Sequence, residues 1–151
     1  MKPTLSIVGE ELLVREAMVK NPVTIGPNAT VIEAVRLLRD KNIGSVIMVD
    51  KDKVLGIAIE RDLVRRVLAE DRDPKAVKLR DVMSRSVISI EAGNDVVDAA
   101  QLMKQKGISR LVVMEGDKLV GIITSDDLAS NMKHAVEELA TTLLIMESER
   151  T

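Results

Sequence analysis

The stretch GIITSDDL, residues 121–128, has a close copy in GIAIERDL, residues 56–63. Each copy begins with a glycine and an apolar segment and continues into residues suited to the first turn of a helix. The copies differ at one chemically important position, where Thr124 of the second corresponds to Ile59 of the first. The fold therefore depends on how two such copies combine, and the function on whether Thr124 marks a binding site or a helix cap.

An offset of 65 residues aligns the two halves of the chain. Residues 18–63 match residues 83–128 without a gap, and 13 of the 46 aligned positions are identical. Repetition of this length predicts two copies of one structural unit. Because a unit of about 60 residues buries too little surface to be comfortable alone, we expect the copies to pack together with pseudo-twofold symmetry.

Each repeat predicts the order strand, helix, strand, strand, helix. The first has apolar strand segments at 22–25, 45–50 and 54–59 and helical periodicity at 28–43 and 60–70. The second has strands at 87–90, 110–115 and 118–124 and helices at 94–107 and 125–132. The polar KDK at 51–53 predicts a hairpin turn. The predicted organisation is an N-terminal segment at 1–11, a first repeat at 12–70, a connector at 71–78 that contains Pro74, a second repeat at 79–132 and a helical extension at 133–151.

An apolar stripe predicts that the last helix continues far beyond the second repeat, to about residue 148. Its members recur at steps of three or four: Leu128, Met132, Val136, Leu139, Leu143 and Met146. Such a stripe requires a partner surface, so it either folds back on its own chain or forms a dimer contact. The second alternative predicts a homodimer.

The composition excludes several classes of function. There is no Cys, which excludes disulfides, thiolate catalysis and cysteine-ligated metals, and there is no Phe, Trp or Tyr to stack on bases. A net charge of -2 gives no basic surface for nucleic acid. The N-terminus lacks the apolar segment of a signal peptide, and no stretch approaches the roughly 20 apolar residues of a membrane helix, so we expect a cytoplasmic protein.

The segments AMVKNPVTI, VIEAVRLLRDKNIGSVIMVD and VLGIAIERDL, with their partners DVMSRSVISI and VVDAAQLMKQKGISRLVVMEGDKLVGIITSDDL, resemble a tandem pair of cystathionine β-synthase (CBS) domains, called a Bateman module. The resemblance covers residues 12–132. It implies an α/β fold of two βαββα repeats packed sheet to sheet, with a cleft at each pseudo-symmetric end. It also implies a regulatory module whose clefts bind an adenosine-containing ligand such as AMP, ADP, ATP or S-adenosylmethionine.

The family's GxxTxxD pattern corresponds here to Gly121, Thr124 and Asp127. It implies that the carboxylate accepts hydrogen bonds from the ribose diol, that the hydroxyl lies near phosphate, and that the glycine lets the cleft wall approach the ligand. The free N–H groups at the helix start also favour an anion. By the same resemblance, the cleft is completed by small and aliphatic residues: Ala17, Ile43, Gly44 and Ser45.

The second cleft departs from the pattern, because Ile59 and Glu60 replace the hydroxyl with an apolar group and an extra negative charge. We expect it to be weaker, vacant or suited to a different ligand. The resemblance implies that Asp62 there faces Val82, Ile108, Ser109 and Arg110. The alternatives are that Arg110 is a solvated strand-end charge and that Asp62 complements the helix dipole.

A structural interpretation of TSDD competes with the binding site, because Thr followed three residues later by an acid is also a helix capping box. The corresponding alternative function is a ligand-independent adaptor that builds a dimer or heteromeric contact. In either case the regulated partner protein is not named by this sequence.

Catalytic and metal-binding patterns are weak. His134 is the only histidine, which leaves no nucleophile and base pair, so we expect no enzyme activity. DKDKVLG at 50–56 faintly resembles a calcium loop, but its twelfth position is Arg61 where a bidentate Glu is needed, so a hairpin turn is favoured. The eight methionines are best explained as core residues.

Overall fold

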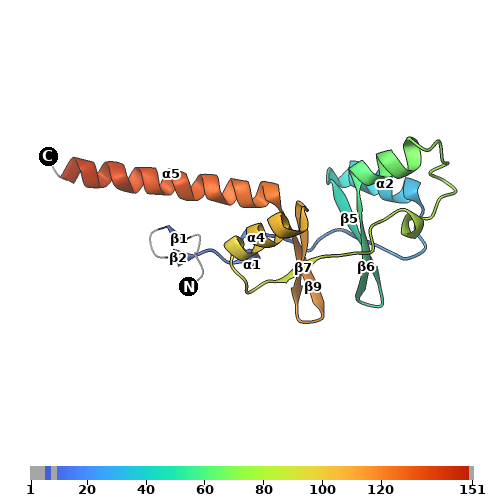
Figure 1. Ribbon diagram of the computed structural model, residues 1–151, viewed down its shortest axis with the longest axis horizontal. Helices are drawn as coiled ribbons and strands as arrows, with labels where there is room; N and C mark the ends of the chain where they lie inside the picture. Colours follow the sequence, from blue (N-terminus) through green and yellow to red (C-terminus); the bar gives the residue numbers. More distant parts are fainter. Residues whose placement is uncertain (1–5, 8–9, 150–151) are drawn as a thin grey trace. The chain divides into compact units, whose positions relative to one another are not determined.

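The structure is a computed structural model that describes residues 6–7 and 10–149. It divides into two compact units (Figure 1). The β9 unit, named after its central strand, comprises Met1–Lys20, Ser89–Gly116 and Val120–Thr151, and the β6 unit comprises Asn21–Ile88 and Asp117–Leu119. Each unit therefore combines residues of both repeats. The predicted domain boundaries stay predictions, and part of the predicted N-terminal segment lies outside the described residues.

The β6 unit contains a three-stranded sheet in the order β4-β5-β6. Its elements are β4 (Thr24–Ile25), α2 (Val31–Lys41), β5 (Ser45–Asp50), β6 (Lys53–Ile59), α3 (Glu60–Leu63), η1 (Val64–Leu68) and η2 (Leu79–Asp81). Strand β4 is parallel to β5, with α2 as the crossover, and β5 is antiparallel to β6. Lys51 and Asp52 both have positive φ, which closes the predicted hairpin tightly.

The helix predicted at 60–70 changes type along its length. It begins as α3 and continues as a π-helical turn, η1. A π turn is rare and is seen mostly as a single turn inside a helix. Apolar periodicity predicts that a helix forms here, but it does not distinguish the π form from the α form.

The β9 unit contains a four-stranded sheet in the order β3-β9-β8-β7. Its elements are β1 (Ser6–Ile7), β2 (Glu10–Glu11), α1 (Val14–Ala17), β3 (Val19–Lys20), β7 (Ser89–Glu91), α4 (Val96–Lys106), β8 (Arg110–Glu115), β9 (Lys118–Thr124) and α5 (Ser125–Glu149). Helix α5 follows β9 without a loop, as Figure 1 shows, and its length confirms the predicted extension. The two repeats of strands and helices confirm the predicted α/β fold. Within the described part of the chain, no helix has the length and apolar character needed to span a bilayer.

The repeats exchange their leading segments. In the β9 unit, residues of the first repeat bind the second: the Val14 N–H donates to the Asn94 carbonyl at 2.8 Å. In the β6 unit the equivalent bond runs from the Leu79 N–H to the Ala29 carbonyl at 3.0 Å. These two bonds are related by the same 65-residue offset as the sequence. Neither repeat can therefore complete its unit without the other.

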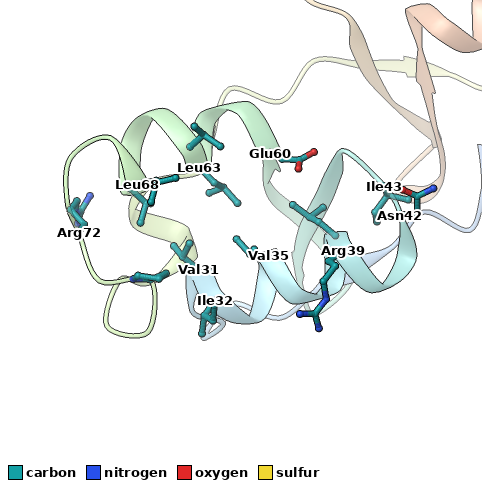
Figure 2. A pocket seen from close by; sticks show the side chains of 14 residues that line it. Val31, Ile32, Val35, Arg39, Asn42, Ile43, Glu60, Leu63, Leu68 and Arg72 are labelled. Atoms are coloured by element: carbon teal, nitrogen blue, oxygen red, sulfur yellow. The ribbon is translucent and has the colours of Figure 1, made fainter.

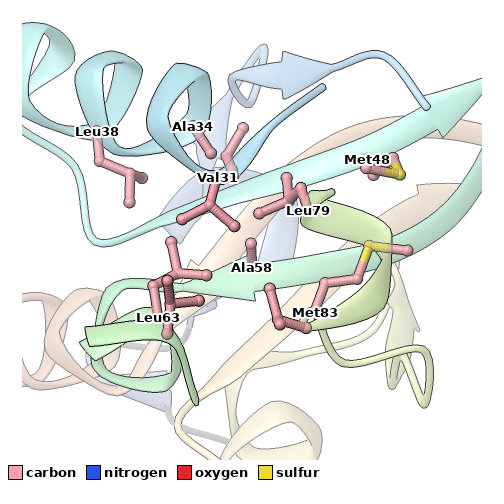
Figure 3. Packing of buried hydrophobic residues seen from close by; sticks show 11 residues of the cluster. Val31, Ala34, Leu38, Met48, Ala58, Leu63, Leu79 and Met83 are labelled. Atoms are coloured by element: carbon pink, nitrogen blue, oxygen red, sulfur yellow. The ribbon is translucent and has the colours of Figure 1, made fainter. Parts of the chain in front are cut away.

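Figure 3 shows how the exchange builds the core of the β6 unit. Leu79 and Met83, which belong to the second repeat, lie against Ala58 and Leu63 of the first. Leu79 is fully buried and Met83 nearly so. Because burying a side chain of this size contributes about 1.5–3 kcal/mol, the exchanged segment is an integral part of the core.

Two equivalent glycines allow the exchanged segments to approach the sheets. A Cβ at Gly121 would clash with Met18 Sδ and would lie 2.8 Å from the Val19 carbonyl oxygen. A Cβ at Gly56 would lie 2.6 Å from the Ser84 carbonyl oxygen and 2.7 Å from Met83 Sδ. All four contacts are too short for a methyl group. Glycine is therefore required at both positions by packing alone.

We expect Gly121→Ala to lower the free energy of unfolding by about 1–3 kcal/mol, as overpacking of a close contact does. Gly26→Ala is the matched control, because nothing lies within 4 Å of a Cβ there. Urea denaturation followed by circular dichroism measures both. Adding Met18→Ala to Gly121→Ala should restore part of the lost stability, because it removes the clash with the methionine side chain. The recovery should be only partial, since the clash with the Val19 carbonyl remains. Equal stability of the two glycine variants would contradict the packing assignment.

Candidate functional site

Reciprocal hydrogen bonds join Thr124, the last residue of β9, to Asp127 in the first turn of α5. The backbone N–H and the hydroxyl of Thr124 both donate to Asp127 Oδ2, at 2.9 and 3.0 Å. The Asp127 backbone N–H donates in return to Thr124 Oγ1 at 3.2 Å. This is a capping box, which satisfies backbone donors on both sides of the helix start.

The capping box uses one oxygen of the carboxylate. Among the described residues, the hydrogen bonds to the Asp127 side chain go to Oδ2. An ionised carboxylate has two oxygens and about four acceptor positions, so Oδ1 can still accept from a ligand. Capping and binding are therefore compatible roles for half-buried Asp127. The Thr124 hydroxyl hydrogen, in contrast, is already directed at Asp127, so this residue positions the carboxylate.

The equivalent junction in the first repeat lacks this arrangement. Ile59 is the N-cap residue of α3, and it makes no side-chain cap. Asp62 is half-buried like Asp127, but no hydroxyl at position 59 holds its carboxylate. Both first turns contain a second acid, which is Glu60 in α3 and Asp126 in α5. The two junctions share a backbone path and differ in the chemistry of their side chains.

Each junction is tied to the start of the middle strand of its own repeat. The Ser125 N–H donates to the Ser109 carbonyl at 2.9 Å, and the Glu60 N–H donates to the Gly44 carbonyl at 3.0 Å. Because β8 begins at Arg110, its guanidinium is attached at the same end of the β8-β9 hairpin as the Thr124 cap. Arg110 therefore shares a unit and a hairpin end with Thr124 and Asp127, whereas the predicted second cleft places it opposite Asp62 of the β6 unit.

The predicted site residues divide between the two units. The β9 unit holds Ala17, Ile108, Ser109, Arg110, Gly121, Thr124 and Asp127. The β6 unit holds Ile43, Gly44, Ser45, Asp62 and Val82. Each predicted cleft draws on both sets, so the meeting of its two halves stays a prediction.

Sequence reasoning missed the role of the methionines that precede β3 and follow η2. Met18 packs at Gly121, and Met83 packs at Gly56. The signal was present, because Met18 and Met83, like the two glycines, are identical at the 65-residue offset. The structure thus gives Gly121 a packing role that is separate from the predicted approach to a ligand.

Within the described residues, no group of three or more His, Asp or Glu side chains is placed to hold a metal ion. His134 lies in α5, and its side chain is outside the described part of the structure. Residues 51 and 52, in the segment that faintly resembles a calcium loop, form the β5-β6 turn.

Two α/β repeats with exchanged segments and a strand-to-helix junction bearing an oriented carboxylate define a tandem-repeat binding module. The sequence model of the CBS domain matches residues 14–69 and 79–134. The chain therefore belongs to the CBS domain family, as the two repeats indicate.

Two relatives are similar to this chain over most of its length. The protein MK0525 of Methanopyrus kandleri is 40% identical over 117 residues, which cover 76% of this chain and 60% of that protein. The CBS domain-containing protein YhcV of Bacillus subtilis is 34% identical over 118 residues, which cover 78% of this chain and 84% of YhcV. The chain thus spans less than two thirds of MK0525 and most of YhcV.

A solved structure with the same fold contains ligands. The CBS domain pair of protein MJ0100, in complex with 5'-methylthioadenosine and S-adenosyl-L-methionine, matches with a TM-score of 0.73 and 27% sequence identity. The match covers 85% of this chain and 98% of that chain. The family and this neighbour support a regulatory ligand-binding module.

We expect Thr124→Val to destabilise the protein by about 0.5–2 kcal/mol, because it removes the cap at the start of α5. Thermal unfolding followed by circular dichroism measures the loss. Ile59→Val is the matched control at the uncapped junction and should cost no more than about 1.5 kcal/mol of side-chain burial. If adding Asp127→Ala to Thr124→Val lowered stability by the full sum of the single effects, the two side chains would not act as one capping box.

Proposed function

We propose that the protein is a regulatory module that binds an adenosine-containing ligand through Asp127 and transmits occupancy to a partner protein. The observation that carries the proposal is the oriented carboxylate, whose Oδ2 is held by Thr124 while Oδ1 can accept. Two adjacent hydroxyls, such as those of a ribose, can donate to one carboxylate at once. The MJ0100 ligands, 5'-methylthioadenosine and S-adenosyl-L-methionine, both contain adenosine.

The proposed cleft combines the Asp127 junction with residues of the other repeat. Ala17 lies in the β9 unit with Asp127, and the resemblance to CBS pairs adds Ile43, Gly44 and Ser45 from the β6 unit. Small side chains at Ala17 and Gly44 leave room for a purine. Because the chain has no aromatic residues, aliphatic side chains would contact the faces of the purine. Backbone groups would contact its edge.

The proposed ligands are AMP, ADP, ATP and S-adenosylmethionine, which differ in the group attached to the adenosine. The backbone N–H groups at the start of α5 favour an anionic group, and a helix of this length supplies the dipole. The Thr124 hydroxyl would have to leave Asp127 in order to donate to a phosphate. A ligand without phosphate near Thr124 is therefore accommodated with less rearrangement.

The second cleft is the weaker site in this proposal. Asp62 supplies a carboxylate there, but Ile59 gives it no hydroxyl partner and Glu60 adds negative charge. The residues expected opposite are Val82, Ile108, Ser109 and Arg110. Arg110 would attract an anionic group of a ligand in this cleft, whereas Glu60 would repel that group.

Transmission would begin at the junction itself. A ligand on Asp127 bears directly on the first turn of α5, which then continues to Glu149. A ligand that binds one arrangement of this helix more tightly raises the population of that arrangement, which changes the helix surface that a partner meets. The difference in affinity between the arrangements sets the size of this shift. We propose that the chain works as a homodimer in the cytoplasm, with no catalytic role.

An adaptor without a ligand is the second candidate. The capping box favours it, because Thr124 and Asp127 have a complete structural role without any bound molecule. In that case the repeats and α5 would serve assembly alone.

Equilibrium dialysis against AMP, ATP and S-adenosylmethionine tests the ligand proposal. Without Phe, Trp or Tyr, the protein is nearly transparent at 260 nm, so bound ligand can be read by absorbance. We expect saturable binding that Asp127→Asn weakens at least about tenfold, since a charge-assisted hydrogen bond contributes about 1.5–3 kcal/mol. The amide oxygen of Asn can still accept from Thr124, while its NH₂ cannot accept from a ribose.

Asp62→Asn is the matched control and should leave the tighter binding event unchanged. Equal binding by wild type and Asp127→Asn would contradict the assignment of the site. If wild type bound none of the three ligands at millimolar concentration, the adaptor would replace the sensor as the function.

A further inference from the structure

The helical run formed by α3 and η1 has two faces in the β6 unit. Figure 2 shows one of them, where Leu63 and Leu68 line an apolar pocket together with side chains of α2. Within the described part of the chain, neither Asp62 nor Arg66 belongs to the lining of that pocket. Because these two residues are four positions apart on one helical run, their side chains are neighbours on its surface. Arg66 therefore shares a face with the carboxylate of the predicted second cleft.

Arg66 ties this helical run to a segment of the other repeat. Its Nη1 donates to the Val82 carbonyl at 2.7 Å, in a short, partly buried hydrogen bond that the positive charge strengthens. Val82 is only 3% exposed and directly follows η2, in the segment that the second repeat contributes to this unit. The Val82 N–H donates to the Leu79 carbonyl at 3.1 Å. Both backbone polar groups of Val82 are thus already engaged.

The equivalent side chain of the second repeat is used differently. Arg66 corresponds to Asn131 at the 65-residue offset. Asn131 Nδ2 donates to the Asp127 carbonyl at 2.7 Å, one turn earlier in the same helix. Among the described residues, the side-chain hydrogen bond of Asn131 therefore stays within α5 and does not reach Ala17, the counterpart of Val82. The tie that Arg66 makes between the repeats is specific to the β6 unit.

The backbone also differs between the two exchanged segments. Ala17 is the last residue of α1, which is an α-helix. At the equivalent place in the β6 unit, η2 is a 3₁₀-helix that ends at Asp81, and Val82 has φ −124° and ψ −10°. These angles lie outside the α-helical values, so the Val82 carbonyl is directed differently from that of a helical residue. Arg66 holds the carbonyl in this direction.

An adenine has an edge that both donates and accepts hydrogen bonds, since its amino group donates while its ring nitrogens accept. In the proposed function backbone groups meet this edge, and Ala17 and Val82 have corresponding places in the two clefts. At Val82 the acceptor is occupied by a guanidinium, which has donors only. The amino hydrogens of adenine would have to share the carbonyl oxygen with this cation, which repels them. A donor left unpaired on burial weakens binding.

We propose that Arg66 determines the specificity of the second cleft by withholding the Val82 carbonyl from an adenosine-containing ligand. The inference rests on the proposed function and adds a cause for the weaker cleft that is separate from Ile59 and Glu60. The chain then binds one adenosine-containing ligand per copy, at Asp127.

A graft of the second repeat's junction tests this role of Arg66. The double variant Ile59→Thr/Glu60→Ser gives the first repeat the residues found at 124–125. Equilibrium dialysis against S-adenosylmethionine and AMP measures the number of ligands bound per chain. We expect the graft to bind one equivalent, as wild type does. Adding Arg66→Asn, the residue of the second repeat, should raise the number to two.

Arg65→Asn in the same graft is the matched control, because it removes the charge of a neighbouring exposed arginine. It should leave the number at one. The ligand bound at Asp127 reports in each variant that the chain is folded, and Asp127→Asn should then leave only the new site occupied. Two equivalents in the graft that retains Arg66, or one equivalent after Arg66→Asn, would overturn the proposal. A wild type that binds neither ligand would instead overturn the proposed function.

Amide hydrogen exchange tests the tie itself without any ligand. The Ser84 N–H, two residues beyond Val82, donates to the Ile57 carbonyl at 3.0 Å. We expect Arg66→Asn to speed exchange of the Ser84 amide at least about tenfold, because a hydrogen bond to a charged group is stronger than a tenfold change requires. Arg65→Asn should not change the rate. If Arg66→Asn also left the rate unchanged, Arg66 would not hold the exchanged segment and the inference would fail even where ligand binds.

Discussion

The structure depends on the close approach of an exchanged backbone segment to a glycine in each unit. At Gly121 the neighbours are Met18 and Val19, and at Gly56 they are Met83 and Ser84. A side chain on either glycine would push away a segment that also supplies core residues such as Leu79. This constraint explains why the two repeats belong to one chain, since each provides a piece that the other cannot replace.

The strand-to-helix junctions that follow the two glycines also carry the side chains that are candidates for ligand binding. Gly121 and Asp127 lie on one short segment, so the packing that fixes β9 also fixes the start of α5. Thr124 then orients the carboxylate with two hydrogen bonds to Oδ2. The capping box and the proposed binding site thus use one geometry. The first repeat keeps the glycine and the acid but lacks the hydroxyl, so its geometry is less constrained.

Much of the fold could be predicted from the sequence because it is local or repeated. The 65-residue offset, the KDK hairpin and the apolar stripe of α5 correspond directly to structural elements. The TSDD segment was correctly seen to allow a capping box. The exchange of Met18 and Met83 was not predicted, because it joins residues far apart in the chain and leaves no local periodicity. Two features depend on atomic geometry that no residue pattern specifies. They are the oxygen of Asp127 that can still accept a hydrogen bond and the π form of η1.

The central claim is that Asp127, held by Thr124, is the ligand-binding carboxylate, and that its counterpart Asp62 is not equivalent. Amide chemical shifts measured during titration with S-adenosylmethionine and AMP test it most directly in a protein of 16.5 kDa. The account predicts saturable shifts concentrated at residues 121–128, with smaller changes at 56–63. Shifts of equal size at both junctions, or at 56–63 alone, would contradict it.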